Sequence, residues 1–384
     1  MIILVINMQK IGIICEYNPF HNGHLYHLNY IKKNFPDALI ILVMSGEFTE
    51  RADISILTKW EKTEIALHYG VNLVVELPFD FACQSADLFA YGAIRILNYL
   101  KVDKIIFGSE SNNINKLKDL AKKQLDSNYY LDVKNYLKDG DNYPLAMAKA
   151  LDDINFNTPN DILGLAYVRE IIKNNYNIEP ITIKRTNDYN SLDLNNNISS
   201  ATAIREALKK NEDIKNYVPE KVYPYLQDNI PVLDNYFKYL KYRIINEQED
   251  IIKYHGVDDK ILPRIINNIN DAFSFDELIT KIKTKNYSYN RIKRMLIYIL
   301  IGFKKDDMNK DINYIRILGF DNKGQEYLNK LKKEIDIPII TSYRNNKNNY
   351  LDINTKITNI LLLENSKLKD EFKNHAINAY LVNK

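Results

Sequence analysis

Short runs of consecutive hydrophobic residues alternate with longer mixed segments over the first half of the chain. The runs are rich in Ile, Leu and Val, which is typical of strands buried on both faces of a parallel sheet. The mixed segments have the length and apolar spacing of helices. This alternation predicts an α/β fold in which helices flank a parallel sheet. We expect its strands at residues 10–15, 38–43, 73–77, 104–107 and 181–184.

A stretch rich in Lys, Asn and Tyr interrupts this alternation between residues 113 and 175. Its apolar spacing is mostly helical, with clear helical stretches at 143–151 and 161–173. We therefore expect a helical insertion within the order of the strands.

Helical runs dominate after about Glu212, and proline-containing segments mark the change. The sequence predicts an α/β domain over residues 8–212, with Met8 as the natural start, and a mainly helical domain over residues 213–384. Residues 312–318 and 337–341 are expected to add a small α/β element near the end.

The segment from Gly12 to His24 combines a strand, a tight turn at Asn18-Pro19 and the start of a helix. His21 and His24 lie one helical turn apart and face the same side, and Gly23 leaves room for a ligand. Unpaired N–H groups and the positive end of the helix dipole favour an anion there, and imidazoles can donate hydrogen bonds to phosphate oxygens. The segment therefore predicts a polyphosphate site, the alternative being two surface histidines after a loop.

Marked residues also follow the other expected strands, and ligands of open α/β sheets bind beyond these carboxyl ends. The residues are Ser45-Gly46, Glu76-Leu77-Pro78, Gly108-Ser109-Glu110 and Arg185.

Two helix starts carry residues that could bind a ligand or simply cap the helix. Asn160 and Asp161 precede an apolar-periodic run, where such residues usually accept helix N–H groups. Ser199 and Ser200 precede another, with Arg205 further into the helix, an arrangement that suits a triphosphate. The alternatives are that the serines cap and that Arg205 is a surface residue.

Composition narrows the class of protein. With 384 residues, 46% hydrophobic and 26% charged, the chain can bury a large core and form two or three domains. Cys15 and Cys83 suggest neither a disulfide framework nor a zinc site, so a reducing cytoplasm is the default. No apolar run is long enough to cross a bilayer, and the apolar start lacks the features of a signal peptide.

A net charge of +3 does not by itself indicate a nucleic-acid partner, but its distribution is informative. Residues 281–294 contain two tyrosines and no acidic residue, and basic groups with interleaved aromatics suit RNA. The alternative is the solvated start of an amphipathic helix, since an apolar stripe follows. The basic residues are Lys281, Lys283, Lys285, Arg291, Lys293 and Arg294.

The string Glu16-Tyr17-Asn18-Pro19-Phe20-His21-Asn22-Gly23-His24-Leu25-Tyr26-His27 resembles the tRNA(Met) cytidine acetate ligase (TmcAL) family of the HIGH-type nucleotidyltransferase superfamily. Further stretches match that family in order, so the resemblance spans most of the chain. They are Met44-Ser45-Gly46, Lys59-Trp60, Val75-Glu76-Leu77-Pro78, Phe107-Gly108-Ser109-Glu110, Pro159-Asn160-Asp161-Ile162-Leu163-Gly164, Ile183-Lys184-Arg185 and Ile198-Ser199-Ser200-Ala201-Thr202-Ala203-Ile204-Arg205.

The resemblance implies a Rossmann-like HIGH-type nucleotidyltransferase domain that binds ATP, and a helical domain that binds tRNA. It also implies a two-step reaction. Acetate attacks the α-phosphate of ATP to give acetyl-adenylate, and the wobble cytidine of elongator tRNA(Met) then takes the acetyl group to become N4-acetylcytidine. Neither step demands a protein nucleophile, because acetate is already ionised at neutral pH.

The family motifs also imply residue roles. His21 and His24 are the expected catalytic pair, Ser199, Ser200 and Arg205 are possible phosphate contacts, and the six basic residues of 281–294 are possible tRNA contacts. No metal cage is visible, so Mg²⁺ would arrive with ATP. The expected ATP-binding residues are Ile14, Cys15, Glu16, Tyr17, Asn18, Pro19, Phe20, His21, Asn22, Gly23, His24, Leu25, Tyr26, His27, Gly108, Asn160 and Arg185.

Two residues of the string keep open roles. Glu16 would repel phosphate unless it bound magnesium, a ribose hydroxyl or an amine. Cys15 is expected to be a buried strand thiol, because nothing next to it lowers its pKa.

Two other functional classes remain open on the sequence. A small-molecule adenylyltransferase, acting on a phosphopantetheine-like or mononucleotide acceptor, would use the same histidines but would not need the basic second half. A noncatalytic RNA-binding module would have no use for both histidines and the serine-rich segment.

Overall fold

The computed structural model describes residues 8–141, 143–154, 156–185, 199–227, 230–343 and 350–379. One eight-stranded sheet runs through the molecule in the order β5-β4-β1-β2-β3-β6-β7, and β8 also pairs with β6. The five expected strands are present and run parallel to one another, which confirms the predicted α/β fold. They are β1 (Lys10–Cys15), β2 (Leu39–Ser45), β3 (Leu73–Leu77), β4 (Lys104–Ser109) and β5 (Glu179–Lys184).

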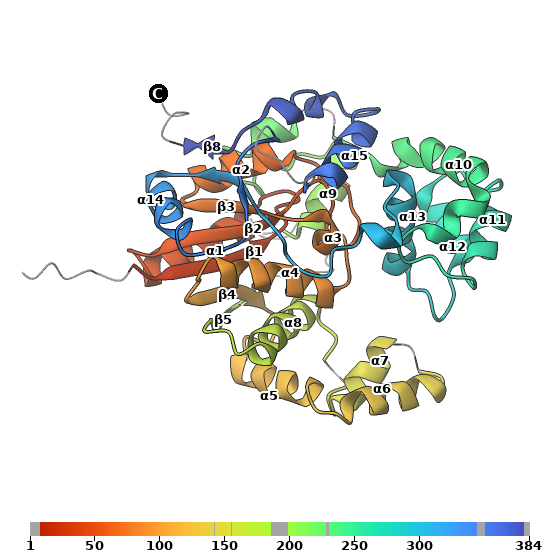
Figure 1. Cartoon of the computed structure of the whole chain (residues 1–384), viewed down its shortest axis with the longest axis horizontal. Helices are drawn as coiled ribbons and strands as arrows, with labels where there is room; N and C mark the ends of the chain where they lie inside the picture. Colours follow the sequence, from red (N-terminus) through yellow and green to blue (C-terminus); the bar gives the residue numbers. More distant parts are fainter. Residues whose placement is uncertain are drawn as a thin grey trace, which may run out of the picture.

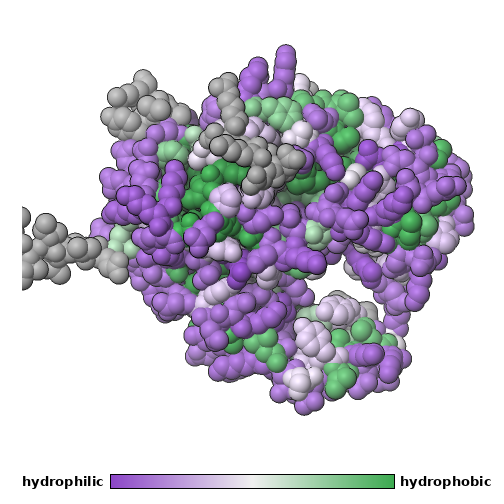
Figure 2. All heavy atoms as spheres, in the orientation of Figure 1, coloured by the Kyte–Doolittle hydropathy of each residue, from purple (hydrophilic) through white to green (hydrophobic). Residues whose placement is uncertain are grey.

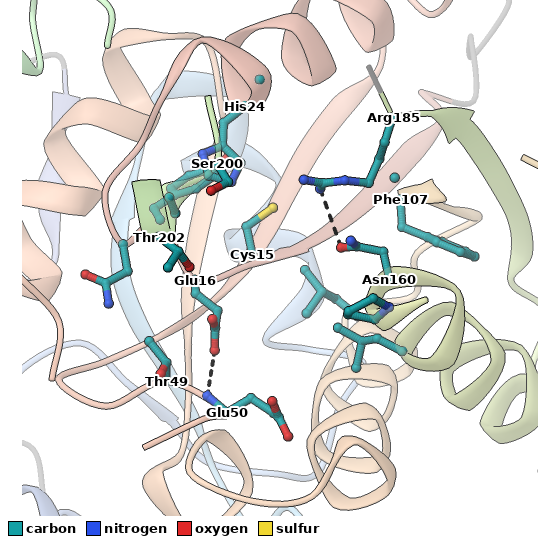
Figure 3. Close-up of a pocket in the computed structure, with 18 of the residues that line it drawn as sticks. Cys15, Glu16, His24, Thr49, Glu50, Phe107, Asn160, Arg185, Ser200 and Thr202 are labelled. Atoms are coloured by element: carbon teal, nitrogen blue, oxygen red, sulfur yellow. Dashed lines mark hydrogen bonds between the residues drawn. The ribbon is translucent and has the colours of Figure 1, made fainter. Parts of the chain in front are cut away.

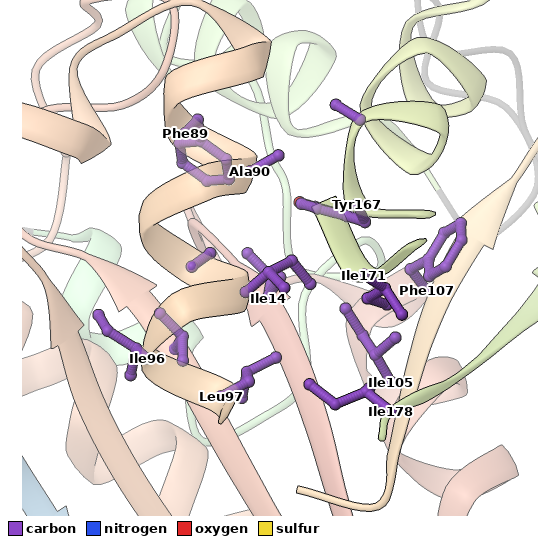
Figure 4. Close-up of a cluster of buried hydrophobic side chains, with 14 of the residues drawn as sticks. Ile14, Phe89, Ala90, Ile96, Leu97, Ile105, Phe107, Tyr167, Ile171 and Ile178 are labelled. Carbon is purple, nitrogen blue, oxygen red and sulfur yellow. The ribbon is translucent and has the colours of Figure 1, made fainter. Parts of the chain in front are cut away.

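Successive side chains of a strand point to opposite faces of the sheet, and on both faces they are apolar. Helices therefore cover both faces. Ile14, Ile41 and Val43 pack with α4 (Ala86–Tyr99) and α8 (Pro159–Lys173) on one face. Figure 4 shows this packing around Ile14, with Phe89 from α4 and Tyr167 from α8. Ile13, Ile40 and Leu42 pack on the other face with α1 (Asn22–Asn34), α2 (Lys59–His68) and α9 (Ala201–Lys209). Burial on both faces explains the unbroken hydrophobic runs of the sequence.

The chain reverses its direction across the sheet beside β1. It runs from β1 through β2 to β3, and then crosses to β4 and β5 on the other side of β1. The carboxyl ends of β1 and β4 therefore form a topological switch point, where open α/β sheets bind their ligands.

The predicted helical insertion lies between β4 and β5 and contains four helices. The helices are α5 (Ile114–Gln124), α6 (Tyr129–Lys138), α7 (Tyr143–Ala150) and α8. Of these, α6 and α7 form an arm that projects from the sheet (Figure 1).

A helical region follows the sheet domain, as expected, and its apolar core also takes in residues of the loop after β2, such as Phe48 and Ile54. Its main helices are α10 (Phe237–Asn246), α11 (Leu262–Asn268), α12 (Phe275–Ile282) and α13 (Tyr289–Ile301). In the space-filling view an opening separates this region from the α6–α7 arm (Figure 2). The ammonium of Lys285 nevertheless reaches the carbonyl oxygen of Gly140 at the tip of the arm.

The C-terminal residues return to the sheet domain, where the expected small α/β element forms part of the main sheet. β6 (Ile315–Phe320) pairs antiparallel with β3, and β7 (Ile339–Ile340) and β8 (Ile377–Asn378) pair with β6. These strands extend the main sheet because the edge of β3 offers unpaired backbone groups. The division of the chain at residue 212 stays a prediction, and the sheet draws on both sides of it.

The remaining short elements connect these parts, and no helix among the described residues is long and apolar enough to cross a membrane. The elements are α3 (Phe79–Ala82), α14 (Asn322–Leu331), α15 (Asp352–Leu361), η1 (Tyr223–Leu226), η2 (Leu233–Tyr236), η3 (Gln248–Lys253), η4 (Lys305–Asp307), η6 (Ser366–Leu368) and η7 (Glu371–Lys373).

Candidate active site

A cavity of about 400 Å³ lies at the switch point beside the carboxyl ends of β1 and β4. Residues from widely separated parts of the chain line it, including α9 and the start of α13. Most of the predicted ligand-binding residues are among them. These are Ile14, Cys15, Glu16, Tyr17, Asn18, His21, Gly23, His24, Tyr26, His27, Gly108, Asn160, Arg185, Ser199, Ser200 and Arg205.

Four residues of the predicted ATP segment are not among those that line the cavity: Pro19, Phe20, Asn22 and Leu25. Phe20 is fully buried and stacks on Tyr69, with ring centroids 5.2 Å apart. The Asn22 backbone N–H and side-chain amide donate to the carbonyl oxygens of Tyr217 and Asn216. Pro19 is buried, and Leu25 packs against the apolar core. These residues support the turn rather than face a ligand.

His21 and His24 cap the helix that carries them. The Gly23 N–H donates to His21 Nδ1 at 3.0 Å, and the His21 N–H donates to His24 Nδ1 at 3.2 Å. The two rings lie 3.8 Å apart between centroids. Since each Nδ1 accepts a hydrogen bond, the neutral rings carry their proton on Nε2. The reading of two unconnected surface histidines is therefore wrong.

Both imidazoles are held neutral in the free protein. Burial, aided by the charges of Arg185 and Arg205, lowers the pKa of His21 to about 3. Burial and the neighbouring His21 ring lower the pKa of His24 well below its ordinary value. Without an anion beside them, these rings therefore act as hydrogen-bond donors rather than as fixed cations at neutral pH.

Asn160 and Arg185 meet on the opposite wall (Figure 3). The Asn160 amide Nδ2 donates to Glu110 Oε1 at 2.5 Å, so its Oδ1 is turned to Arg185 Nη1 at 3.4 Å. Glu110 also accepts the N–H groups of Asn160 and Asp161. The start of α8 is therefore capped by Glu110 and not by Asn160. The Asn160 side chain lines the cavity instead.

Asp161 takes no part in capping either. Its carboxylate accepts hydrogen bonds from the Ser109 hydroxyl at 2.5 Å and from the Ser111 N–H at 3.0 Å. It thus joins the end of β4 to α8. A Cβ at Gly108 would lie 3.1 Å from Arg185 Cγ, so the missing side chain lets the arginine pack closely.

The serine-rich segment contributes differently from residue to residue. The Ser200 hydroxyl caps α9 by accepting the Ala203 N–H at 3.1 Å, as the alternative reading expected. The Ser199 hydroxyl is buried beside the cavity without a hydrogen bond to the described residues. Arg205 points inward and donates to the Asn18 carbonyl and to Asp53 Oδ2, so it is not a surface residue. Ile198 lies outside the described residues.

The loop between β2 and α2 forms a wall that the sequence did not predict. Thr49, Glu50, Arg51 and Asp53 line the cavity from this loop, and no motif marks them. Lys62 of α2 holds the loop in place, because its buried ammonium donates to the carbonyl oxygens of Ser45 and Gly46 at 2.8 Å and of Glu16 at 3.2 Å. In the sequence, only the polar residues that follow the end of β2 could have indicated this wall.

Glu16 lies against this wall. Its Oε1 accepts the Glu50 N–H at 2.6 Å (Figure 3). Burial raises the pKa of Glu16 to about 7. Burial likewise raises the pKa of Cys15 to about 12, which keeps this residue a neutral thiol, as expected.

The predicted basic cluster divides into two groups. Lys281, Lys283, Lys285 and Arg291 are exposed, and the Arg291 guanidinium lies 4.5 Å from the centre of the Tyr287 ring. Lys293 and Arg294 instead turn inward and pair with Asp53 and Glu50 of the cavity wall. Arg291, Lys293 and Arg294 are close in sequence, but the geometry of α13 places Arg291 on a different side from Lys293 and Arg294.

No group of three or more His, Cys, Asp or Glu side chains that could hold a metal ion occurs within the described ranges.

The comparisons with known proteins agree with this geometry. A family model described as HIGH Nucleotidyl Transferase matches residues 8–375. A tRNA(Met) cytidine acetate ligase of Caldicellulosiruptor saccharolyticus is 38% identical over 96% of this chain and 98% of its own length. One of Geobacillus is 39% identical over 88% of this chain and 90% of its own length.

Two crystal structures of Thermotoga maritima TmcAL are also similar. The apo form has a TM-score of 0.88 at 30% identity and covers 97% of this chain and 99% of its own. The form bound with alpha-thio ATP has a TM-score of 0.85 at 29% identity, with the same coverage. The strand order, the cavity and these matches lead to one conclusion: the chain belongs to the tRNA(Met) cytidine acetate ligase family of HIGH nucleotidyl transferases.

Proposed function

We propose that this protein is an ATP-dependent acetate ligase that forms acetyl-adenylate and transfers its acetyl group to the wobble cytidine of elongator tRNA(Met), giving N4-acetylcytidine. The observation that carries the proposal is a paired-histidine helix start facing Arg185 and Asn160 across a cavity at the switch point. Relatives named for this activity match the chain over nearly its whole length.

In the first step, ATP occupies the cavity with its phosphates at the start of α1. The Nε2–H groups of His21 and His24 donate to phosphate oxygens, and the Ser199 hydroxyl and the inward-facing Arg205 lie on the same side. Donors fixed before the reaction stabilise the charge that grows when the α-phosphate becomes five-coordinate. Acetate needs only to be placed in line, because it is already a nucleophilic anion.

The nucleotide is held between the end of β1 and α8. Asn160 offers a carbonyl oxygen, and carbonyl oxygens suit an N–H or O–H donor such as a ribose hydroxyl. Mg²⁺, carried by the phosphates, neutralises part of their charge when bound. We assign the ATP contacts to the predicted residues that line the cavity, except Glu16, whose carboxylate lies against the loop after β2, and we leave out Pro19, Phe20, Asn22 and Leu25.

In the second step, tRNA docks along the exposed basic residues of α12, of the following turn and of the start of α13. Lys281, Lys283, Lys285 and Arg291 attract its backbone, and Asn290, next to Arg291, lines the cavity. A base turned out of the loop can then reach the acetyl-adenylate. We assign this reaction to the cytoplasm, where tRNA and ATP meet.

The direct test incubates the protein with ATP, labelled acetate and unmodified tRNA. We expect label in elongator tRNA(Met) and release of AMP and pyrophosphate. Absence of label in tRNA, together with AMP transfer to a small-molecule acceptor, would instead support an adenylyltransferase.

A further inference from the structure

The cavity has two chemically different sides. Two facing walls, one with His21, His24 and Ser199 and the other with Arg185, together give one side donors and positive charge. The other side is formed by Glu16 and by Thr49, Glu50 and Asp53 of the loop after β2, and the start of α13 reaches it through Asn290. In Figure 3 the Glu16 side chain extends from β1 toward Glu50 and away from Arg185 and Asn160.

Glu16 differs from the other carboxylates of this acidic side. Glu50 pairs with Arg294, and Asp53 pairs with Lys293 and Arg205. Among the cavity-lining carboxylates of the described chain, Glu16 alone has no Lys, Arg or His nitrogen within 4 Å. Its Oε1 is held by the Glu50 N–H, and its Oε2 makes no hydrogen bond to the described residues.

An oxygen in this setting accepts hydrogen bonds from a ligand. It repels phosphate, which the opposite side attracts, whereas carboxylates accept hydrogen bonds from the exocyclic N4 amine of cytosine. The acidic side also adjoins α13, the helix through which we propose that RNA docks.

We propose that the acidic side of the cavity receives the amine-bearing base of the acceptor RNA, and that the Glu16 carboxylate is the catalytic base that takes a proton from the exocyclic amine. This inference rests on the proposed function and adds an acceptor subsite and a residue role to it.

The transfer step balances as follows. The N4 nitrogen forms a bond to the acetyl carbonyl carbon, and the bond between that carbon and the phosphate oxygen breaks. AMP leaves with the electron pair of the broken bond. The proton lost by N4 passes to Glu16, and solvent removes it after the product has left.

The surroundings poise Glu16 for this role. Burial raises the pKa of Glu16 to about 7; the hydrogen bond from the Glu50 N–H and the charge of Lys62 on α2 lower it, and the charges of Glu50 and Asp53 raise it. Cys15 on β1 and Tyr167 on α8 face the same group and stay protonated at neutral pH, because burial raises the pKa of each. A base with a pKa near the working pH is the most effective in proton transfer.

The experiment separates the two steps with Glu16→Gln, which keeps the size and the hydrogen bond to Glu50. Acetate-dependent exchange between ATP and pyrophosphate, without tRNA, reports the first step. Single-turnover transfer from labelled acetyl-adenylate, preformed on the enzyme, to unmodified elongator tRNA(Met) reports the second. Glu334→Gln is the control, because Glu334 pairs with Lys101 in an exposed ion pair far from the cavity.

We expect Glu16→Gln to slow transfer at least about 100-fold and to slow exchange less than about 10-fold. In the unaltered protein the transfer rate should rise with pH and level off above about 7, following ionisation of the group. Glu16→Gln should lose this rise, and Glu16→Asp should restore part of the rate together with the pH dependence.

The proposal is overturned if Glu16→Gln transfers acetyl at the normal rate, retains the pH dependence, or loses exchange as strongly as transfer. If the unaltered protein catalyses acetate-dependent exchange between ATP and pyrophosphate but never labels tRNA, the proposed function is refuted, and this inference with it.

Discussion

The histidine pair shows how strongly single residues are shaped by their neighbours. The Nδ1 atom of each imidazole accepts a hydrogen bond from a backbone N–H at the start of α1, so the Nε2–H group can donate to a ligand. The sequence predicts this pair because one turn of helix aligns the two rings whatever the rest of the fold does. It could not assign Glu110 as the cap of α8, since the two elements are joined only by tertiary structure.

His21→Ala and His24→Ala should each lower acetate-dependent pyrophosphate release at least about 100-fold, because each removes a donor from the developing charge. Circular dichroism should show an intact fold, since loss of one cap costs only about 1 kcal/mol. His68→Ala, in an exposed position at the end of α2, is the control. Near-normal turnover in either cavity variant would remove that histidine from the catalytic set.

Glu110→Ala should weaken ATP binding without disabling catalysis. The Asn160 amide would lose the partner that fixes its orientation, and one hydrogen bond is worth about 0.5–1.5 kcal/mol. We expect a rise of about 2-fold to 10-fold in KM for ATP, with kcat little changed, in steady-state kinetics. An unchanged KM for ATP would mean that Asn160 does not contact the nucleotide.

At the level of elements, the central strands could be predicted because burial on both faces leaves unbroken hydrophobic runs. The pairing of β6 with β3 could not, since it joins strands that lie far apart in sequence. The basic run of 281–294 was predicted as one surface, yet Lys293 and Arg294 turn toward the cavity wall. Only the packing of α13 decides which charges face solvent.

A buried ion cluster fastens the C-terminal segment to α2 and β3. The Lys59 ammonium lies 2.9 Å from Glu371, 3.1 Å from Glu76 and 3.6 Å from Glu47, and the Trp60 indole N–H donates to Glu371 at 2.5 Å. Removing the cation would leave these carboxylates buried without their partner.

Lys59→Met should therefore lower the free energy of unfolding by about 3–5 kcal/mol in urea denaturation. Lys101→Met provides the comparison, because the Lys101–Glu334 pair is exposed and such pairs contribute about 0–1 kcal/mol. Equal losses in the two variants would show that the cluster does not stabilise the fold.

Across the whole molecule, the cavity lies in the sheet domain, and the helical region, which carries exposed positive charge, reaches it through Asn290. The family motifs named most of the residues that line the cavity on the side of β1, β4 and α8. They did not name the loop after β2, because that wall forms only when Lys62 ties the loop to the ends of β1 and β2.

Replacement of Lys281, Lys283, Lys285 and Arg291 by Ala should raise the Kd for tRNA at least about 10-fold at low salt and reduce its dependence on salt concentration. The matched control replaces four exposed lysines of the α14 region, Lys323, Lys330, Lys332 and Lys333, with the same change of charge. Filter binding would measure both. Equal weakening in the two variants would indicate attraction by net charge alone.

The central claim is that the helix start bearing His21 and His24 holds the triphosphate of ATP. A crystal structure with a non-hydrolysable ATP analogue tests it most directly. We expect phosphate oxygens within hydrogen-bonding distance of Nε2 of both rings, on the side of the cavity away from Glu16. An analogue bound with its phosphates elsewhere, or bound outside this cavity, would contradict it.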